Sequence, residues 1–151
     1  MTLMTQNEVY SFLTSGTMTA KISSTGLDGK PHVAPVWFVV DGNPSQDVIN
    51  IIITFTTYGK SLKARHLISN PRVCLCVDDQ TPPYSFVIVN GIAEIDQSPK
   101  EEELLKYTTQ IAERYMGKEN AERYGKRNAV PGEFIIRIRP TKIIAQKNVS
   151  D

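Results

Sequence analysis

Hydrophobic residues recur along this chain with two periods, and the change from one period to the other predicts where helices and strands begin. A capping-box pattern at residues 5–8 precedes apolar residues at helical spacing, which predicts a short helix that ends at Gly16. Apolar and polar residues then alternate through residues 17–23, as in a half-buried strand, and a turn follows at residues 26–29. We therefore expect an opening helix followed by the first strand of a hairpin.

Most of the later apolar segments have the pattern of strands. They alternate with polar residues or are rich in β-branched and aromatic residues, and Gly, Pro, Asn and Asp separate them. The predicted strands cover residues 31–40, 48–57, 72–78, 84–95, 133–139 and 142–146. Within the longest of these strands, Gly91 predicts a β-bulge.

Two segments between the strands change to the helical period. The first covers residues 61–69 and stops at the Asn-Pro pair that follows it. The second begins with an N-cap at Ser98 and ends at Gly117. We assign no element to the polar segment at residues 118–132.

This succession of elements predicts the fold class. Six or seven strands, antiparallel where the loops are short, with a few intervening helices are typical of a β-barrel rather than of a doubly wound parallel sheet. We expect a mainly β (α+β) fold, namely a six-stranded antiparallel split β-barrel with a few flanking helices. A chain of 151 residues favours a single domain, residues 1–151.

Composition and charge exclude several classes of function. The chain has 17 Lys and Arg against 16 Asp and Glu, and this balance does not supply the basic surface that binding to nucleic acid requires. Its longest apolar run, residues 36–40, is far shorter than the roughly 18 to 20 residues of a membrane-spanning helix. The N-terminal residues lack the basic start and apolar run of a secretory signal. We expect a cytoplasmic protein that binds neither nucleic acid nor membranes.

Few side chains indicate catalysis by themselves. The sequence contains no glycine-rich phosphate loop, nucleophile elbow or paired zinc-ligand motif. Cys74 and Cys76 lie too close together on a predicted strand to form a disulfide, and we interpret them as small apolar side chains. We interpret His32 and His66 as surface or hydrogen-bonded residues. We therefore name no catalytic residue and expect no metal site.

One concentrated group of polar residues lies where a predicted strand passes into the helix at residues 61–69. Its members are Thr54, Thr56, Thr57, Lys60, Ser61, Lys63, Arg65 and His66. Hydroxyl groups, lysine charges and the free amides of a helix N-terminus all donate to anions, so this group is suited to a phosphate monoester. A solvated basic helix face is the alternative interpretation.

Five segments form an ordered set with recognisable spacing. They read DGKPHVAPVWF at 28–38, TFTT at 54–57, SLKAR at 61–65, NPRV at 70–73 and VIVNGIAE at 87–94. Together they resemble the pyridoxamine 5'-phosphate oxidase-like split-barrel family. The resemblance implies a homodimer that binds FMN, or in one branch a deazaflavin coenzyme, in two equivalent clefts between the subunits.

The resemblance also implies which residues bind the cofactor. Lys63 matches the lysine that grips the cofactor's phosphate, and Thr57 and Ser61 match hydroxyl positions near that phosphate. Thr56 lies beside them on the same strand end, and Lys60 belongs to the same polar group.

Two further positions match the strand whose backbone runs along the flavin ring, Val36 and Trp37. The expected cofactor-binding set is therefore Val36, Trp37, Thr56, Thr57, Lys60, Ser61 and Lys63. The aromatic candidates to stack on a ring or to line a substrate cleft are Trp37, Tyr84, Phe86 and Tyr115. Arg137 is expected to face solvent, a partner subunit or a ligand, solvent being the first choice.

Departures from the family pattern bear on the reaction. Ala34 and Leu62 stand where the authentic oxidases carry arginines for the phosphate, and Phe86 stands where they carry a glutamine near the flavin. Oxidation of vitamin B6 is therefore not expected. The pattern at residues 35–38, together with residues 83–84 and 115–117, is closer to the short branch that is labelled deazaflavin-dependent.

The expected function is that of an FMN-binding oxidoreductase that acts on a small molecule by hydride transfer, since the cofactor in such proteins carries the chemistry. One alternative is a deazaflavin-dependent reductase. The others are a non-catalytic module that binds flavin or haem and a structural dimer with an empty cleft.

Overall fold

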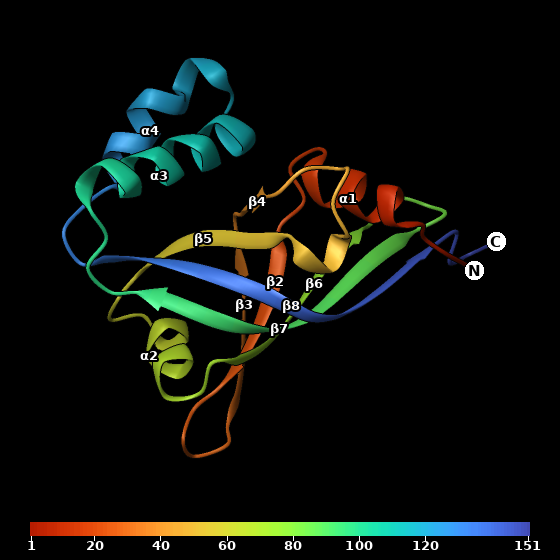
Figure 1. Cartoon of the computed structure of the whole chain (residues 1–151), viewed down its shortest axis with the longest axis horizontal. Coiled ribbons are helices and arrows are strands. Elements are labelled where there is room, and N and C mark those ends of the chain that lie inside the picture. The colour runs from red at the N-terminus through yellow and green to blue at the C-terminus, as the bar shows by residue number, and fades with distance from the viewer.

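One antiparallel sheet organises the chain in the computed structural model, which describes all residues 1–151 (Figure 1). Its strands are β1 (Thr2–Leu3), β2 (Ala20–Thr25), β3 (Pro31–Val36), β4 (Val39–Asp41), β5 (Ile52–Tyr58), β6 (Arg72–Asp79), β7 (Ser85–Asp96) and β8 (Glu133–Lys147). The strand order is β3-β2-β6-β7-β8-β5-β4, and β1 pairs with β8. The mainly β (α+β) class is confirmed, but the sheet has 8 strands rather than six.

The sheet curls into a split barrel because its two edge strands are neighbours in the chain. β3 and β4 lie at opposite ends of the strand order, yet only Trp37 and Phe38 separate them. The two edges of the sheet must therefore meet at this break, although no ladder of hydrogen bonds joins β3 to β4. This closure brings the end of β3 close to β5 and fixes where a cleft forms.

Four α-helices flank the sheet (Figure 1). They are α1 (Gln6–Thr14), α2 (Leu62–Ser69), α3 (Glu101–Met116) and α4 (Ala121–Asn128), and two 3₁₀ turns are η1 (Val48–Asn50) and η2 (Lys118–Asn120). Helices α3 and α4 lie against each other at one end of the sheet, and a Cβ on Gly125 would lie 2.3 Å from Oγ1 of Thr109. Only glycine at this position allows the two helices to approach so closely. No helix combines the length and the apolar character needed to cross a bilayer.

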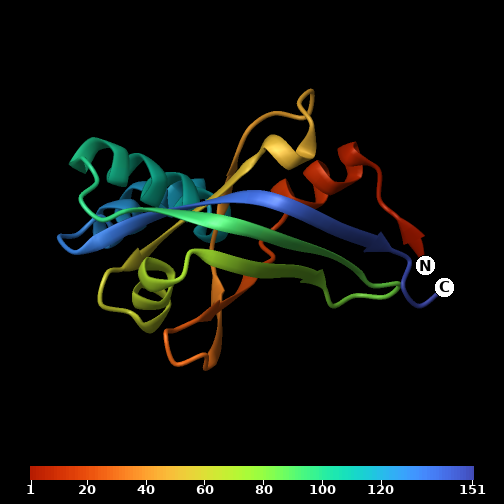
Figure 2. The same ribbon diagram turned by 60° about the horizontal axis from the view of Figure 1, so that its bottom comes forward.

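The barrel interior holds the main hydrophobic core, a cluster of 20 buried residues that includes Phe38 and Phe55. Val73, Leu75 and Val77 alternate along β6, and all three are buried as the period-2 pattern predicts. Figure 2 shows the first and last segments of the chain side by side, where β1 pairs with the end of β8.

The opening helix and the bulge are confirmed. The side chain of Thr5 accepts from the amide of Glu8, and the side chain of Glu8 accepts from the amide of Thr5, which completes the predicted capping box of α1. The register of β7 against β8 shifts between Asn90 and Gly91, as predicted. A Cβ on Gly91 would lie 2.6 Å from the carbonyl oxygen of Arg139, so glycine is required where the two backbones approach.

The C-terminal strands differ from the prediction. Residues 133–139 and 142–146 belong to one strand, β8, rather than to two. Pro140, which lies between the two expected segments, cannot donate a hydrogen bond to a ladder. In the structure Pro140 lies opposite Gly91 at the register shift, where a missing donor is tolerated.

Three other boundaries were wrong. The expected strand at 31–40 is interrupted at Trp37 and Phe38, and the strand at 48–57 begins with the 3₁₀ turn η1, which the side chain of Asp47 caps. The second long helix begins after Lys100 rather than after Ser98.

Helix α4 was missed within the polar segment at 118–132. Only Ala121 and Gly125 of this helix are buried, and residues this small leave no apolar periodicity in the sequence. The helix is recognisable only once α3 is present for it to pack against.

Candidate functional site

A cleft of about 360 Å³ lies where the end of β3, the end of β5 and the start of β8 face helices α2, α3 and α4. Its lining residues are Pro35, Val36, Trp37, Thr56, Thr57, Lys63, Ile111, Asn128 and Glu133. Five of the seven predicted cofactor residues are therefore brought together in one cleft. The exceptions are Lys60 and Ser61.

The two exceptions lie close to the cleft but do not line it. Lys60 is exposed on the turn before α2. The hydroxyl of Ser61 lies 3.2 Å from the hydroxyl of Thr57 and accepts from the amide of Ala64 at 3.2 Å, so it caps α2. Ser61 thus orients a residue that lines the cleft, whereas Lys60 does not line it.

Lys63 and Glu133 are the two charged residues that line the cleft. Burial lowers the pKa of the Lys63 ammonium, and the negative charge of Glu133 opposes this effect. Burial also raises the pKa of the Glu133 carboxyl, whereas the side chain of Thr56 and the charge of Lys63 lower it. The two groups form no ion pair with each other, so each remains free to interact with a ligand.

The local fold adds donors beside Lys63. This residue lies in the first turn of α2, where the backbone amides have no intrahelical acceptor and the helix dipole is positive. Thr57 is buried and Thr56 is half-buried, so their hydroxyl groups are shielded from bulk water. This end of the cleft can therefore receive an anionic group.

Another part of the cleft wall is the aromatic ring of Trp37. The ring of Trp37 stacks on the ring of Tyr115, with centroids 5.1 Å apart and planes inclined by 2°. The hydroxyl of Tyr115 donates to the carbonyl of Met18 at 2.9 Å and accepts from the amide of Phe38 at 3.3 Å. Burial raises the pKa of this phenol, so it stays protonated and able to donate.

Arg114 fixes the same break in the strand. Its guanidinium donates to the carbonyls of Leu13 at 2.9 Å, Gly16 at 3.0 Å and Phe38 at 2.9 Å, and it lies over the ring of Phe38. It therefore ties the end of α1 and the β3–β4 connection to α3. Two consecutive residues of α3, Arg114 and Tyr115, hold the aromatic wall in place.

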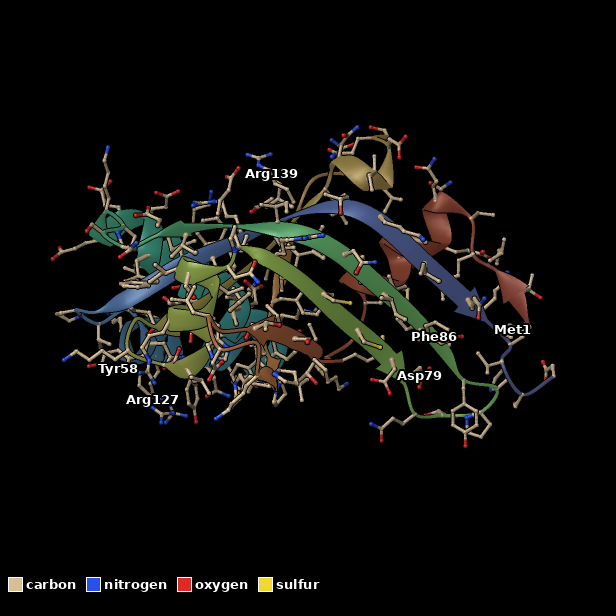
Figure 3. All side chains as sticks on the ribbon, turned by 90° about the horizontal axis from the view of Figure 1, so that it is seen from below. Met1, Tyr58, Asp79, Phe86, Arg127 and Arg139 are labelled. Carbon is tan, nitrogen blue, oxygen red and sulfur yellow. The ribbon has the colours of Figure 1, made fainter.

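Two of the predicted aromatic candidates lie elsewhere. Figure 3 shows Phe86 toward the end of the molecule that holds Met1, away from Tyr58 at the cleft end. Tyr84 lies two positions before Phe86, in the loop that enters β7. Neither residue lines the cleft. Trp37 does line it, and Tyr115 supports Trp37 from behind.

Arg137 does not project freely into solvent. It forms an ion pair with Glu103 on α3 at 2.5 Å, and its guanidinium lies over the ring of Tyr107. The hydroxyls of Tyr107 and Thr54 both donate to Asp41, at 3.0 and 2.8 Å. Arg137 thus belongs to a polar network that attaches α3 to the sheet.

The histidines and cysteines have structural partners. Nδ1 of His66 lies 3.2 Å from the hydroxyl of Ser24, and the ring of His32 meets that of His66 edge-on. Cys74 and Cys76 are free thiols on one face of β6, and burial raises the pKa of both. These observations agree with the interpretation of all four residues from the sequence.

Sequence reasoning missed four residues of the cleft, of which Pro35 was noted only as part of a family-like segment. Ile111 was recognised only as part of a helical apolar face, and Asn128 and Glu133 lie in or beside a segment to which no element was assigned. The available signal for Glu133 was its position, since it is an acidic residue at the start of a strand with glycine before it and apolar residues after it.

A second cavity of about 600 Å³ adjoins the cleft through Glu133, which lines both. It lies between the start of α3, the end of α4 and the loop that enters β8. Its charged lining residues besides Glu133 are Glu101 and Lys126.

Comparisons with known proteins agree with this fold. A family model described as pyridoxamine 5'-phosphate oxidase matches residues 7–147. No curated protein matches the chain. Among solved structures, the conserved hypothetical protein Rv2991 from Mycobacterium tuberculosis is 26% identical with a TM-score of 0.77, and the match covers 98% of this chain and 88% of that one.

Two further solved structures are similar. An F420 reductase is 25% identical with a TM-score of 0.62, over 88% of this chain and 94% of that one. The haem storage protein HutZ from Vibrio cholerae is 15% identical with a TM-score of 0.64, over 95% and 96% of the two chains, and this likeness concerns the fold alone.

Proposed function

Because the chain belongs to the pyridoxamine 5'-phosphate oxidase family, we propose that it binds a flavin-type cofactor in the cleft around Lys63 and uses it for two-electron oxidoreduction of a small molecule. FMN is the first expectation from the family resemblance. A deazaflavin coenzyme is the alternative. In either case the cofactor, when bound, supplies the hydride chemistry.

The observation that carries this proposal is the division of the cleft into a polar and an apolar part. Lys63, Thr56 and Thr57 lie at the polar part and can hold a phosphate, because an ammonium and two hydroxyls are charged and neutral donors to its oxygens. Trp37 and Ile111 provide aromatic and apolar surface that suits a planar ring. The donor set therefore fits a phosphorylated flavin.

The residues of the chain bind and orient rather than react. Ser61 holds the hydroxyl of Thr57, and Tyr115 holds the ring of Trp37, so both sides of the cleft are positioned before a ligand arrives. Preorganised groups lower the entropic cost of binding. Val36, which is buried at the end of β3, helps to exclude water from the same space.

A specific observation favours the deazaflavin alternative. The F420 reductase is similar at 25% identity over most of both chains, and F420 is a deazaflavin. Ala34 and Leu62 occupy the positions where the sequence comparison expects arginines in the authentic oxidases, so Lys63 is the one basic residue that lines the cleft. Vitamin B6 oxidation is not part of the proposal.

The proposal includes a homodimer with cofactor sites between the subunits. Strand pairing places outward-facing side chains of β3, β2, β6, β7 and β8 next to one another, and much of the sheet face that they form is apolar. Its apolar members are Val33, Pro35, Cys74, Cys76, Phe86, Ile88, Ile92 and Ile144. Val33 is 64% exposed and Ile92 is 39% exposed in the single chain. A second copy would cover this face, which continues to the cleft at Pro35.

Light scattering coupled to size exclusion tests the dimer. We expect twice the mass of one chain at low micromolar concentration, and a stable monomer would contradict a cleft shared by two subunits. The proposal also places the protein in the cytoplasm, where free Cys74 and Cys76 would stay reduced.

The test of the cofactor is an absorbance spectrum of the purified protein, followed by titration of the cofactor-free form with FMN and with the deazaflavin coenzyme. Tight binding of either supports the proposal and identifies the cofactor. Binding without turnover by any reductant would indicate a storage or transfer module, and a Soret band would point to haem. Failure to bind any flavin at micromolar concentration would contradict the proposed function.

A further inference from the structure

Glu133 introduces a negative charge into a cleft that the proposed function assigns to an anionic ligand. Lys63 and Glu133 are the only charged residues among the nine that line the cleft, so its formal charge is zero when both are ionised. The neighbouring cavity does not change this balance, because Glu101 and Lys126 also carry opposite charges there. Among charged side chains, a phosphate at Lys63 therefore meets one attractive and one repulsive group.

We propose that Glu133 is a specificity-determining residue, whose carboxylate removes the advantage that a doubly charged phosphate monoester would otherwise have at Lys63 and so admits a cofactor with a singly charged phosphodiester at least as well. This inference rests on the proposed function and deepens it, since it names the chemical class of the cofactor. FMN is a monoester. Deazaflavin coenzymes and alkyl esters of FMN are diesters.

The position of Glu133 supports this role. It is the first residue of β8 and pairs with Tyr58 at the end of β5, so the backbone of two strands fixes it. It lies between the two cavities and is half-buried. No lysine or arginine forms an ion pair with it, so its carboxylate is not held by a basic side chain, although the charge of Lys63 in the same cleft lowers its pKa.

The charge difference between the two ligand classes is large near neutral pH. A phosphate monoester has a second pKa near 6 and carries about −1.5 to −2 at pH 7. A diester lacks this second ionisation and carries a single charge. In a partly buried cleft, one additional repulsive unit of charge within the same cleft changes affinity by roughly tenfold to a hundredfold.

Lys63 alone would favour the monoester, because attraction also grows with ligand charge. Glu133 offsets this preference. The structure therefore predicts little or no gain in affinity from the second negative charge of FMN, whereas a cleft with lysine alone would show a clear gain.

A matched pair of ligands tests the inference. FMN and its monomethyl phosphate ester have the same flavin ring and ribityl chain and differ in the charge of the phosphate. Riboflavin serves as the uncharged reference. Titrations at pH 7.5 would use the wild type, Glu133→Gln and Glu101→Gln, the last removing a carboxylate from the neighbouring cavity but not from the cleft. Thermal melting verifies that each variant is folded.

The wild type is expected to bind the methyl ester at least as tightly as FMN. Glu133→Gln is expected to tighten FMN by roughly tenfold or more, the methyl ester by less and riboflavin by less than about twofold. Glu101→Gln should leave all three affinities within about twofold.

The possible failures are distinguishable. If the wild type binds FMN much more tightly than the methyl ester, the inference is wrong even without a variant. If Glu133→Gln changes the affinities for FMN and riboflavin equally, the residue affects packing and not charge selection, and the proposed flavin site stands. If folded wild type and variant bind no flavin at all, both the inference and the proposed function fail.

Discussion

The rings of Trp37 and Tyr115 lie parallel, with centroids 5.1 Å apart and planes inclined by only 2°. Trp37 belongs to the break between β3 and β4, and Tyr115 to the end of α3. The stack therefore joins the point where the barrel closes to a helix that covers it. Since Trp37 also lines the cleft, the same contact that closes the fold shapes the candidate site.

The hydroxyl of Tyr115 is expected to contribute to stability independently of the stack. Tyr115→Phe keeps the ring but leaves the carbonyl of Met18 and the amide of Phe38 without this partner. We expect a loss of about 1 to 3 kcal/mol in the free energy of unfolding, measured in urea. Tyr124→Phe is the control, since no hydrogen bond of its hydroxyl is present, and an equal effect of both variants would contradict the assignment.

Lys63 is predicted to contact the cofactor's phosphate. Lys63→Ala should weaken FMN binding by roughly 1.5 to 3 kcal/mol, the range for a hydrogen bond to a charged group. Stability without ligand should barely change, because burial already disfavours the ammonium, as its lowered pKa shows. Fluorescence titration measures the affinity.

Lys60→Ala is the matched control for this experiment. Lys60 is exposed, belongs to the same polar group and lies three positions earlier, but it does not line the cleft. We expect its removal to change the affinity by less than about 0.5 kcal/mol, as for an exposed charge. If the two variants weakened binding equally, general attraction by a basic surface would explain the result better than a contact at Lys63.

Much of the fold follows from local pattern. The capping box of α1, the alternation along β6 and the bulge at Gly91 are encoded within a few residues, so the sequence predicts them correctly. Helix α4 and the break at Phe38 depend on tertiary partners. The need for glycine at position 125 is explained only by its close approach to α3, and the break is explained only by its contacts with Arg114.

The candidate site divides in the same way. Thr56, Thr57 and Lys63 come from one strand-to-helix connection, and their proximity can be predicted because the chain itself keeps them together. Asn128 and Glu133 enter the cleft from distant segments. The place of Glu133 depends on β8 pairing with β5, and that of Asn128 on α4, neither of which a single-sequence pattern specifies.

Arg114 is predicted to be a major source of stability for the closed barrel. Its guanidinium donates to four carbonyls from two segments, including that of Phe38, and lysine cannot reproduce this planar arrangement. Arg114→Lys should lower the free energy of unfolding by about 2 to 4 kcal/mol, since each such bond involves a charged donor. Urea denaturation measures the effect.

The control for Arg114 is Arg123→Lys on α4. Arg123 is exposed, and its hydrogen bond is to the side chain of its helix neighbour Asn120. We expect a change of less than about 0.5 kcal/mol for this variant. A similarly small change in Arg114→Lys would show that the carbonyl contacts do not hold the β3–β4 break.

Glu133 is predicted to make stability fall as pH rises through the weakly acidic range. Burial raises the pKa of its carboxyl in the folded protein above the ordinary value of 4.5. Around that ordinary value the unfolded chain releases the proton first, so ionisation favours the unfolded state. The penalty is complete once the pH exceeds the folded pKa, and it is absent well below 4.5, where both states are protonated.

Glu133→Gln resembles the protonated carboxyl, so it should remove this penalty. We expect the variant to be more stable than the wild type at pH 7 to 8 and the difference to vanish toward pH 4, measured by urea unfolding across this range. Glu119→Gln, at an exposed position, should show no such convergence. A stability difference for Glu133→Gln that stayed constant with pH would mean that packing, and not the buried charge, distinguishes glutamate from glutamine here. In that case the proposed repulsion between the Glu133 carboxylate and an anionic cofactor would lose its physical basis.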